Sequence, residues 1–336
     1  MTIFRGVGML SPKDTILSCN GTTVIDPELA SARPSAVLTA SGKTATVVGL
    51  IRACRPQQWT KNVLLFFGLI FALKLTNLGL DLRALIGFFV FCASSSGVYL
   101  INDLADVEKD RQHPKKRNRP LAAGIITSAQ AITLASVLFV VSIVVSYLMG
   151  PVFAALVVFY VAMMLLYSFA LKHIVLIDVF VLAAGFVIRA VAGAVVVGVP
   201  ISPWLYVCTV LASLFLGLGK RRQEIVLLTS GAGSHRRILE EYSVPLLDQL
   251  IMIVTSSTIM AYSLYTFSAE NLPANHAMMI TIPFVLYGVF RYLYLMHQRN
   301  AGGSPDEVLL SDRPLLVTAL LWLVTAGGVL YLFPPG

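Results

Sequence analysis

Nine long hydrophobic segments, separated by polar connections, constrain the fold more than any other feature of this sequence. A membrane-spanning helix needs about 20 consecutive apolar residues, whereas a transmembrane β-strand shows about 10 residues of alternating polarity. These segments are continuous and close to the helical length, apart from a shorter first and sixth. We therefore predict an all-α, polytopic membrane protein whose nine transmembrane helices cover roughly residues 60–78, 84–104, 124–149, 152–171, 174–198, 203–219, 248–268, 277–297 and 314–333.

The composition excludes an ordinary soluble domain. Only 12% of the 336 residues are charged, 57% are hydrophobic and the mean hydropathy is +0.80, whereas a soluble protein carries about 25% charged residues. The four cysteines have no metal or redox spacing, and there is no phosphate-binding glycine loop, dinucleotide fingerprint or nucleophile elbow. The bilayer is the first partner that we predict, and we expect no nucleic-acid partner.

The positive charges lie mostly on one side of the predicted bundle. With nine spans, 21 of the 25 Lys and Arg residues fall in the N-terminal segment and in the connections on that side. The opposite side has only Lys74 and Arg83, and two more, Arg189 and Arg291, lie within spans. Because Lys and Arg are enriched in cytoplasmic loops, the N-terminus is predicted to be cytoplasmic and the C-terminus to lie outside.

The first fifty residues differ from the rest of the chain. They are rich in Ser, Thr, Ala and Gly, and they show neither a sustained hydrophobic period nor the apolar core of a signal peptide. We predict that residues 1–50 form a disordered cytoplasmic tail and that residues 51–336 form one transmembrane domain.

The stretch 102–120 gathers four acidic and six basic residues in an otherwise apolar chain. Asp103, Asp106 and Asp110 have the i, i+3, i+7 spacing that would place them on one face of a continuing helix. Carboxylates that close repel one another unless a cation lies between them, and oxygen ligands suit Mg²⁺. We predict a Mg²⁺ site there, oriented by Asn102; the alternative is a solvated loop of mixed charge. The following Lys and Arg residues would bind phosphates that the ion carries.

A second polar segment ends the predicted sixth span. Lys220, Arg221, Arg222 and Glu224 follow two glycines, which allow a ligand to approach the backbone. Its position, at the cytoplasmic end of a helix, is the same as that of the acidic stretch, but its charge is opposite. The alternative is a basic anchor for that helix.

A third group surrounds the predicted fifth span. Tyr167 and Lys172 precede it, and Asp178 and Arg189 lie within it, eleven residues or three helical turns apart and so on one stripe. Ionisable residues at membrane depth are candidates for function. The alternative is that each pairs with another span for structural reasons.

The acidic stretch resembles a known motif. Asn102-Asp103-x-x-Asp106-x-x-x-Asp110, followed by Arg119-Pro120-Leu121-Ala122-x-Gly124, is similar to the first Asp-rich motif of the UbiA-type intramembrane prenyltransferase superfamily. The resemblance covers roughly residues 50–333. It implies a bundle of nine helices around a central cavity that is open to the cytoplasm and to the lipid, with Mg²⁺ as the cofactor.

The second motif departs from the usual pattern of that superfamily. Typical members carry a second Asp-x-x-x-Asp where this chain has Lys220–Glu224 with a single acid. The sequence instead resembles the decaprenyl-phosphate phosphoribosyltransferase subgroup, to which several segments fit: Arg55-Pro56-x-Gln58-Trp59-x-Lys61-Asn62, Asp106-Val107-Glu108-x-Asp110-x-x-His113-Pro114, Leu171-Lys172-His173, Gly219-Lys220-Arg221-x-x-Glu224 and Pro305-x-Glu307-x-x-Leu310-x-Asp312-Arg313.

This subgroup resemblance implies a Mg²⁺-dependent pentosyltransferase of the bacterial inner membrane. It would move the 5-phosphoribosyl group of phosphoribosyl pyrophosphate onto a polyprenyl (decaprenyl) phosphate, for arabinan synthesis in the cell envelope. Asn102, Asp103, Asp106 and Asp110 would form the catalytic group and its three Asp residues would hold the metal. The predicted phosphate ligands are Lys61, Lys115, Lys116, Arg119, Lys172, Arg189, Lys220, Arg221 and Arg222, supported by Asn62, Tyr167, Asp178 and Glu224. Whether the chain forms a homo-oligomer is left open.

Two alternatives are retained. The first is a prenyltransferase of the same fold that uses a prenyl diphosphate and an aromatic or polar acceptor. The second is a transporter or channel whose intramembrane charges line an ion path. Against a transporter, the sequence shows no pair of similar halves, and its acids cluster at helix ends rather than in mid-membrane.

Overall fold

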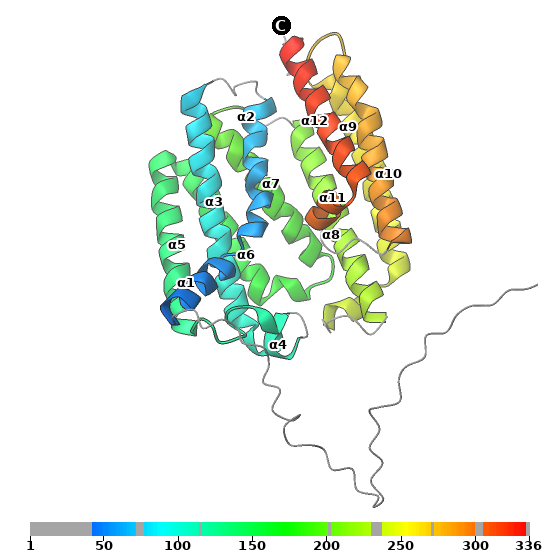
Figure 1. The fold of residues 1–336 in the computed structure, drawn as a ribbon. Helices are drawn as coiled ribbons and strands as arrows, with labels where there is room; N and C mark the ends of the chain where they lie inside the picture. The colour runs from blue at the N-terminus through cyan, green and yellow to red at the C-terminus, as the bar shows by residue number, and fades with distance from the viewer. Residues whose placement is uncertain are drawn as a thin grey trace, which may run out of the picture. The chain divides into compact units, whose positions relative to one another are not determined.

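Long helices that run side by side make up the computed structural model of this protein (Figure 1). The structure describes residues 42–71, 77–113, 116–200, 203–229, 237–269, 272–299 and 305–333. Within these ranges every regular element is helical and none is a β-strand, so the predicted all-α class is confirmed.

The helices in chain order include several short ones that join the long spans. The first, α1, begins at Gly42, so helical structure starts before the predicted end of the tail at residue 50; the remainder of that tail lies outside the described residues. The full order is α1 (Gly42–Ala53), η2 (Pro56–Phe66), α2 (Phe67–Phe71), α3 (Leu78–Ala105), α4 (Val107–Gln112), η3 (Lys116–Asn118), α5 (Ser128–Met149), α6 (Pro151–Phe169), η4 (Leu171–His173), α7 (Ile177–Val197), α8 (Pro203–Thr229), η5 (Arg237–Glu241), α9 (Val244–Ser268), η6 (Ala277–Thr281), α10 (Ile282–Gln298), α11 (Pro305–Ser311) and α12 (Arg313–Leu332).

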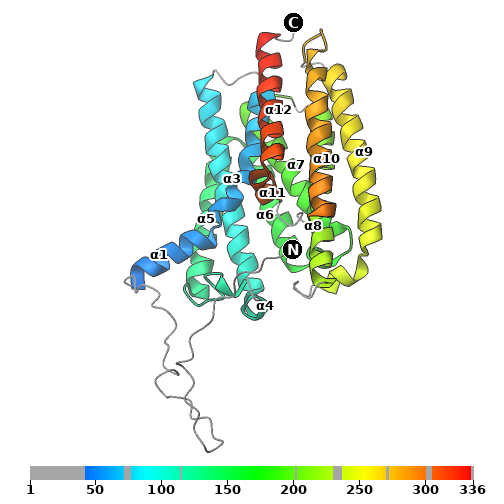
Figure 2. The same ribbon diagram turned by 45° about the vertical axis from the view of Figure 1, so that its right-hand side comes forward.

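Helix α7 lies at the centre of the packing. It contacts η2, α2, α3, α6 and α8, while α3 packs mainly against α5, and α8 mainly against α9. Helices α3, α5 and α6 form one side of the bundle, and α9, α10 and α12 form the other, with α7 and α8 between them (Figures 1 and 2). Apolar clusters fill both sides: one joins α3, α6 and α7, and the other joins α7 to α8, α9 and α10.

Two glycines allow the segment η2–α2 to approach α7 closely. A Cβ atom on Gly193 of α7 would lie 2.1 Å from the carbonyl oxygen of Leu65, and one on Gly68 would lie 2.9 Å from backbone atoms of Ala194. Small residues permit such backbone contact between membrane helices. The approach matters for the site because it brings Asn62, which is fully buried, against α7.

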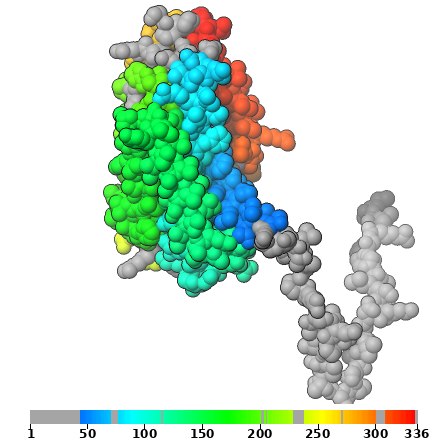
Figure 3. Space-filling view, turned by 90° about the vertical axis from the view of Figure 1, so that its left-hand side faces the viewer, coloured from blue at the N-terminus to red at the C-terminus, as the bar shows by residue number. Residues whose placement is uncertain are grey.

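The outer surface of the bundle is apolar. On α5 the side chains of Val140, Val144 and Leu148 are 61%, 53% and 79% exposed, and Figure 3 shows the face that α3, α5 and α6 present. A soluble monomer rarely exposes so large an apolar area, whereas lipid covers it readily. In the part of the chain that the structure describes, seven helical segments are long and apolar enough to cross a bilayer: α3, α5, α6, α7, α9, η6 with α10, and α12. The predicted polytopic membrane protein is therefore confirmed.

The count of nine spans stays a prediction. The expected first span begins as the 3-10 helix η2 and continues as the short α2 to Phe71, and residues 72–76 lie outside the described ranges. The expected sixth span is the long helix α8, which carries the charged segment Lys220–Glu224 toward its C-terminal end. The connection between the predicted third and fourth spans is a turn at Gly150-Pro151, which joins α5 to α6 with Gly150 as the C-cap and Pro151 as the first helical residue.

Candidate active site

The three Asp residues of the first motif lie where α3 meets α4. This junction is at the end of the bundle opposite the C-terminal end of α12 (Figure 1). Helix α3 ends at Ala105, and Asp106 leaves the helical conformation with φ −101° and ψ 9° before α4 begins. The prediction of one continuing helical face is therefore wrong. Asp103 and Asp110 are buried, at 4% and 3% exposure, whereas Asp106 is half-buried.

Arginine side chains hold the two buried acids together. Nη1 of Arg119 donates to Oδ1 of Asp103 at 3.0 Å and to Oδ2 of Asp110 at 2.6 Å. The guanidinium of Arg55 donates to the same oxygen of Asp103 and lies over the ring of Tyr99, 4.8 Å from its centroid. One guanidinium nitrogen thus lies between two carboxylates, where a cation would neutralise both.

The third acid has a different basic partner. Asp106 accepts hydrogen bonds from Nζ of Lys172 on both carboxylate oxygens, each at 3.0 Å. Lys172 lies on η4, the short element between α6 and α7, and is buried. The three acids of the motif are therefore matched by three bases that come from three separate parts of the chain.

The second motif centres on Arg221, which is only 1% exposed. Its guanidinium donates to Asp178 at 2.5 Å, to Glu224 at 2.5 Å and to the hydroxyl of Tyr167 at 3.2 Å. The structure thus brings together four predicted site residues from α6, α7 and α8. With two carboxylates beside it, however, Arg221 joins helices here rather than presenting a free guanidinium.

Tyr242 completes this network from the connection before α9. Its hydroxyl donates to Asp178 at 2.7 Å and accepts the backbone N–H of Leu176 at 2.7 Å. Leu176 has a φ of 66°, which is strained for a residue with a side chain. Burial, together with the bond to Asp178, raises the pKa of Tyr242. The hydroxyl therefore stays protonated and keeps donating to the carboxylate.

The neighbouring residues of the second motif differ in their surroundings. Arg222 donates to Asp248 at 2.5 Å, and the same carboxylate lies 3.3 Å from Nε2 of His297. Nη1 of Arg222 and Oε1 of Gln223 are buried without a hydrogen-bond partner among the residues that the structure describes. Lys220 is exposed. This part of the motif retains polar atoms that a ligand could engage.

Arg189 lies deeper in the bundle, roughly 18 Å along α7 from its start. It donates from Nε to Asn62, from Nη1 to the carbonyl oxygen of Gly185 and from Nη2 to the hydroxyl of Tyr160, each at 2.7 Å. Asn62 in turn donates to the sulfur of Cys92 at 3.2 Å. The shared stripe of Asp178 and Arg189 does not make them one site, because they join separate networks.

The remaining predicted residues that the structure describes make local hydrogen bonds. Nζ of Lys61 donates to Gln58 at 2.5 Å, and the backbone N–H of Lys116 donates to Nδ1 of His113 at 3.2 Å. Asn102 lies half-buried in the last turn of α3, where its carbonyl accepts the N–H of Asp106. Lys115 lies outside the described residues.

Sequence reasoning did not place three residues in the site. The sequence indicated that Arg55 could be functional, because it belongs to a segment that resembles the subgroup. Nothing in the sequence linked it to Asp103. Nothing in the sequence indicated Tyr242 or Asp248, because each meets its partner from a distant part of the chain.

The donor set of the first motif fits Mg²⁺ in kind. It offers carboxylate oxygens, the ligands that Mg²⁺ prefers, and two of them already share one cationic nitrogen. Within the described part of the chain, no three His, Cys, Asp or Glu side chains lie close enough together to share a metal ion. A metal would therefore have to displace the basic partners and draw the acids together.

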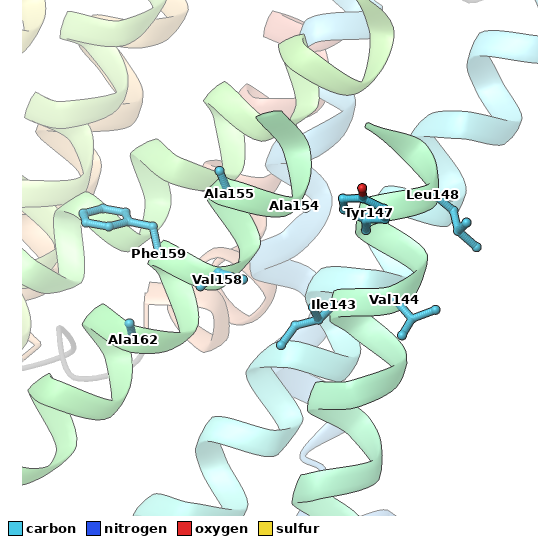
Figure 4. Close-up of a pocket in the computed structure, with 9 residues that line it drawn as sticks. All are labelled: Ile143, Val144, Tyr147, Leu148, Ala154, Ala155, Val158, Phe159 and Ala162. Carbon is cyan, nitrogen blue, oxygen red and sulfur yellow. The ribbon is translucent and has the colours of Figure 1, made fainter. Parts of the chain in front are cut away.

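A separate hollow on the bundle contains none of these residues. It has a volume of about 730 Å³ and lies between α5 and α6 (Figure 4). Its lining is almost wholly apolar: Ile143, Val144, Tyr147, Leu148, Ala154, Ala155, Val158, Phe159 and Ala162. Its lining includes side chains on the exposed apolar face of α5, so it suits a lipid chain rather than phosphate chemistry.

Comparison with known proteins decides the family. The model of the UbiA prenyltransferase family matches residues 63–304. The chain belongs to this family. A solved UbiA homolog from Archaeoglobus fulgidus, bound to GPP and Mg²⁺, shares the fold with a TM-score of 0.64 and 16% identity, over 84% of this chain and 99% of that one. The expected resemblance is therefore confirmed for both sequence and fold.

Curated relatives narrow the resemblance further. The decaprenyl-phosphate phosphoribosyltransferase of Mycolicibacterium smegmatis is 34% identical over 300 residues, which cover 85% of this chain and 93% of that protein. The one from Corynebacterium glutamicum is 36% identical over 293 residues, covering 85% and 88%. These relatives carry the name of the subgroup that the sequence motifs resemble.

Proposed function

We propose that this protein transfers the 5-phosphoribosyl group of phosphoribosyl pyrophosphate to a polyprenyl phosphate, giving polyprenyl phosphoryl phosphoribose and pyrophosphate. The observation that carries the proposal is identity of 34% to 36% with two decaprenyl-phosphate phosphoribosyltransferases over most of both chains. The product would supply pentose for arabinan of the cell envelope.

The charges of the two motifs support a donor with two anionic groups. The first motif pairs three acids with Arg55, Arg119 and Lys172, and the second presents Lys220 and Arg222 beside the buried Arg221 network. A prenyl diphosphate has one polyanionic end, whereas phosphoribosyl pyrophosphate has a pyrophosphate and a separate 5-phosphate. Fixed guanidinium and ammonium groups are suited to the second of these.

The Asp residues and the neighbouring bases would have different roles in the reaction. Asp103, Asp106 and Asp110 would hold Mg²⁺, which neutralises charge on the leaving pyrophosphate. Arg119 and Lys172 already touch these acids and would bind phosphate oxygens beside them. The acceptor phosphate is ionised at neutral pH and needs no general base. Catalysis then rests on positioning and on electrostatic stabilisation, where positioning contributes up to roughly 7–11 kcal/mol.

The distribution of charge supports a membrane arrangement for these residues. Both motifs would face the cytoplasm, from which the water-soluble donor comes, with the N-terminus on the same side of a bacterial inner membrane. The polyprenyl tail would remain in the lipid, which the apolar outer faces of the helices contact. The predicted central cavity would open to the cytoplasm and to the lipid, so that donor and acceptor meet in it.

The test is transfer of label from the donor. Purified protein in proteoliposomes with polyprenyl phosphate, Mg²⁺ and [¹⁴C]-ribosyl-labelled phosphoribosyl pyrophosphate is expected to yield a labelled lipid. Asp103→Asn should lower the rate at least about a hundredfold, because the metal loses a buried carboxylate ligand. The matched control is Asp81→Asn, an Asp in the first turn of the same helix, at its other end, which should stay near the wild-type rate. Consumption of a prenyl diphosphate without ribosyl transfer would favour the prenyltransferase alternative instead.

A further inference from the structure

The acids of the first motif are enclosed by the protein, whereas their arginine partners are more accessible. The side chains of Asp103 and Asp110 are 5% and 4% exposed, and those of Arg55 and Arg119 are each 25% exposed. Arg55 and Arg119 also stand outside the long helices, on the segments before η2 and after η3. Long side chains at such positions have other rotamers available to them. The arginines, rather than the acids, are therefore the groups able to move when a cation arrives.

We propose that Arg55 and Arg119 are exchange ligands, which hold the acids while no metal is bound and turn to the pyrophosphate of the donor when Mg²⁺ takes their place. This inference rests on the proposed function. Its geometric basis is the position of Arg119 Nη1, which bridges Asp103 and Asp110 as a cation would. Guanidinium groups bind phosphate oxygens as readily as they bind carboxylate oxygens. The same two arginines can therefore bind either the acids or the pyrophosphate.

The charges of the cluster explain why the exchange needs both metal and donor. Three carboxylates and three bases leave the cluster close to neutral. A divalent cation alone would add two positive charges to a largely buried site, which is costly. A pyrophosphate that arrives with the metal would restore the balance and accept the displaced guanidinium groups. The exchange therefore predicts that metal and donor strengthen one another's binding.

The backbone conformation of Arg55 directs its side chain toward α3. Arg55 has φ 52° and ψ 61°, the left-handed conformation, and Pro56 follows it at the start of η2. A non-glycine residue in this conformation is strained and persists where the surrounding structure requires it. The ring of Tyr99 gives the guanidinium a second contact that does not depend on Asp103. Arg55 can therefore release the carboxylate and stay beside it.

The first measurement uses Mn²⁺ alone, with no donor. Electron paramagnetic resonance would follow Mn²⁺ binding to the purified full chain in nanodiscs. Arg119→Gln is expected to bind Mn²⁺ roughly tenfold more tightly than the wild type, because the competing guanidinium is gone. Arg55→Gln should change the affinity in the same direction, and it carries the test if Arg119→Gln fails to fold. The control is Arg117→Gln, an exposed neighbour on η3, whose effect should stay below about twofold.

The second measurement adds the donor. With Mn²⁺ at saturation, Arg119→Gln should bind phosphoribosyl pyrophosphate roughly tenfold more weakly, so one change strengthens metal binding and weakens donor binding. Unchanged or weaker Mn²⁺ binding in both arginine variants would overturn the exchange, and so would equal tightening by Arg117→Gln. If the wild type transfers the ribosyl group but neither arginine variant binds Mn²⁺ more tightly, only the proposed exchange is overturned. If the arginine variants bind Mn²⁺ more tightly but the wild type transfers no ribosyl label, the proposed function is overturned. The displacement of arginine by metal would then still hold.

Discussion

Arg189 is a cation near the middle of a membrane-spanning helix, held by neutral acceptors only among the contacts that the structure gives it. A charge at this depth is costly unless its donors are satisfied. The planar guanidinium reaches Asn62, Gly185 and Tyr160 in three directions at once, and it also lies 4.7 Å from the centroid of the Tyr160 ring. The shape of arginine, and not only its charge, is therefore required at this position.

Arg189→Lys should for this reason destabilise the protein although it conserves the charge. A single ammonium cannot reach three separate acceptors, and losing one or two charge-assisted hydrogen bonds costs about 2–4 kcal/mol. Thermal unfolding in a mild detergent would measure the loss. Arg83→Lys is the control, since exposed Arg83 bonds the carbonyl of Met149, and it should change stability by less than about 0.5 kcal/mol. An Arg189→Lys protein that melts with the wild type would contradict this account of the cluster.

The start of α12 depends on an acid that α10 supports. Asp312 is the N-cap of α12, where its carboxylate accepts the N–H of Leu315 at 2.9 Å, and Arg291 of α10 donates to both of its oxygens at 3.2 and 2.8 Å. The hydrogen bond from Arg291 lowers the pKa of Asp312. Because the folded pKa lies below the unfolded value of about 3.9, the stabilisation is complete above that pH and is lost as the pH falls through the folded pKa.

Asp312→Asn isolates this effect because asparagine can still cap the helix. The wild type should melt at a higher temperature than the variant at pH 5 to 7, and the difference should shrink below about pH 4 as Asp312 is protonated. Melting curves over this pH range, at one salt concentration, provide the measurement. A difference that stays constant down to about pH 3 would show that the charge pair does not support the helix.

The long helices were predictable because hydrophobic runs of bilayer length specify them directly, as α5 and α6 with the Gly150-Pro151 turn show. The break at Asp106 was not, since Asp103, Asp106 and Asp110 keep helical spacing across it and no glycine or proline marks it. The 3-10 helix η2 could not be predicted either, because the pattern of its apolar residues is also typical of an α-helix. Spacing alone thus indicated a cluster of acids at the end of α3 but gave the wrong local geometry.

Across the whole molecule, the clustering of the polar motifs at one end of the bundle was predictable, whereas the pairing of their residues was not. The distribution of Lys and Arg predicts that all the polar motifs share one side, and the contacts among Asp103, Asp106 and their bases place those elements at one end of the bundle. Charge counts cannot say which base meets which acid. Lys172 reaches Asp106 because α3 packs against α6 and α7, and Tyr242 reaches Asp178 because α8 packs against both α7 and α9.

The central claim is tested most directly by the mass of the lipid product when both kinds of donor compete. Proteoliposomes with purified protein and Mg²⁺ would receive phosphoribosyl pyrophosphate and geranylgeranyl diphosphate together, with polyprenyl phosphate and an aromatic acid as acceptors. We predict a new lipid that is heavier than polyprenyl phosphate by one phosphoribosyl group, with pyrophosphate released in equal amount. A prenylated aromatic acid as the new product, with no phosphoribosyl lipid, would contradict the account.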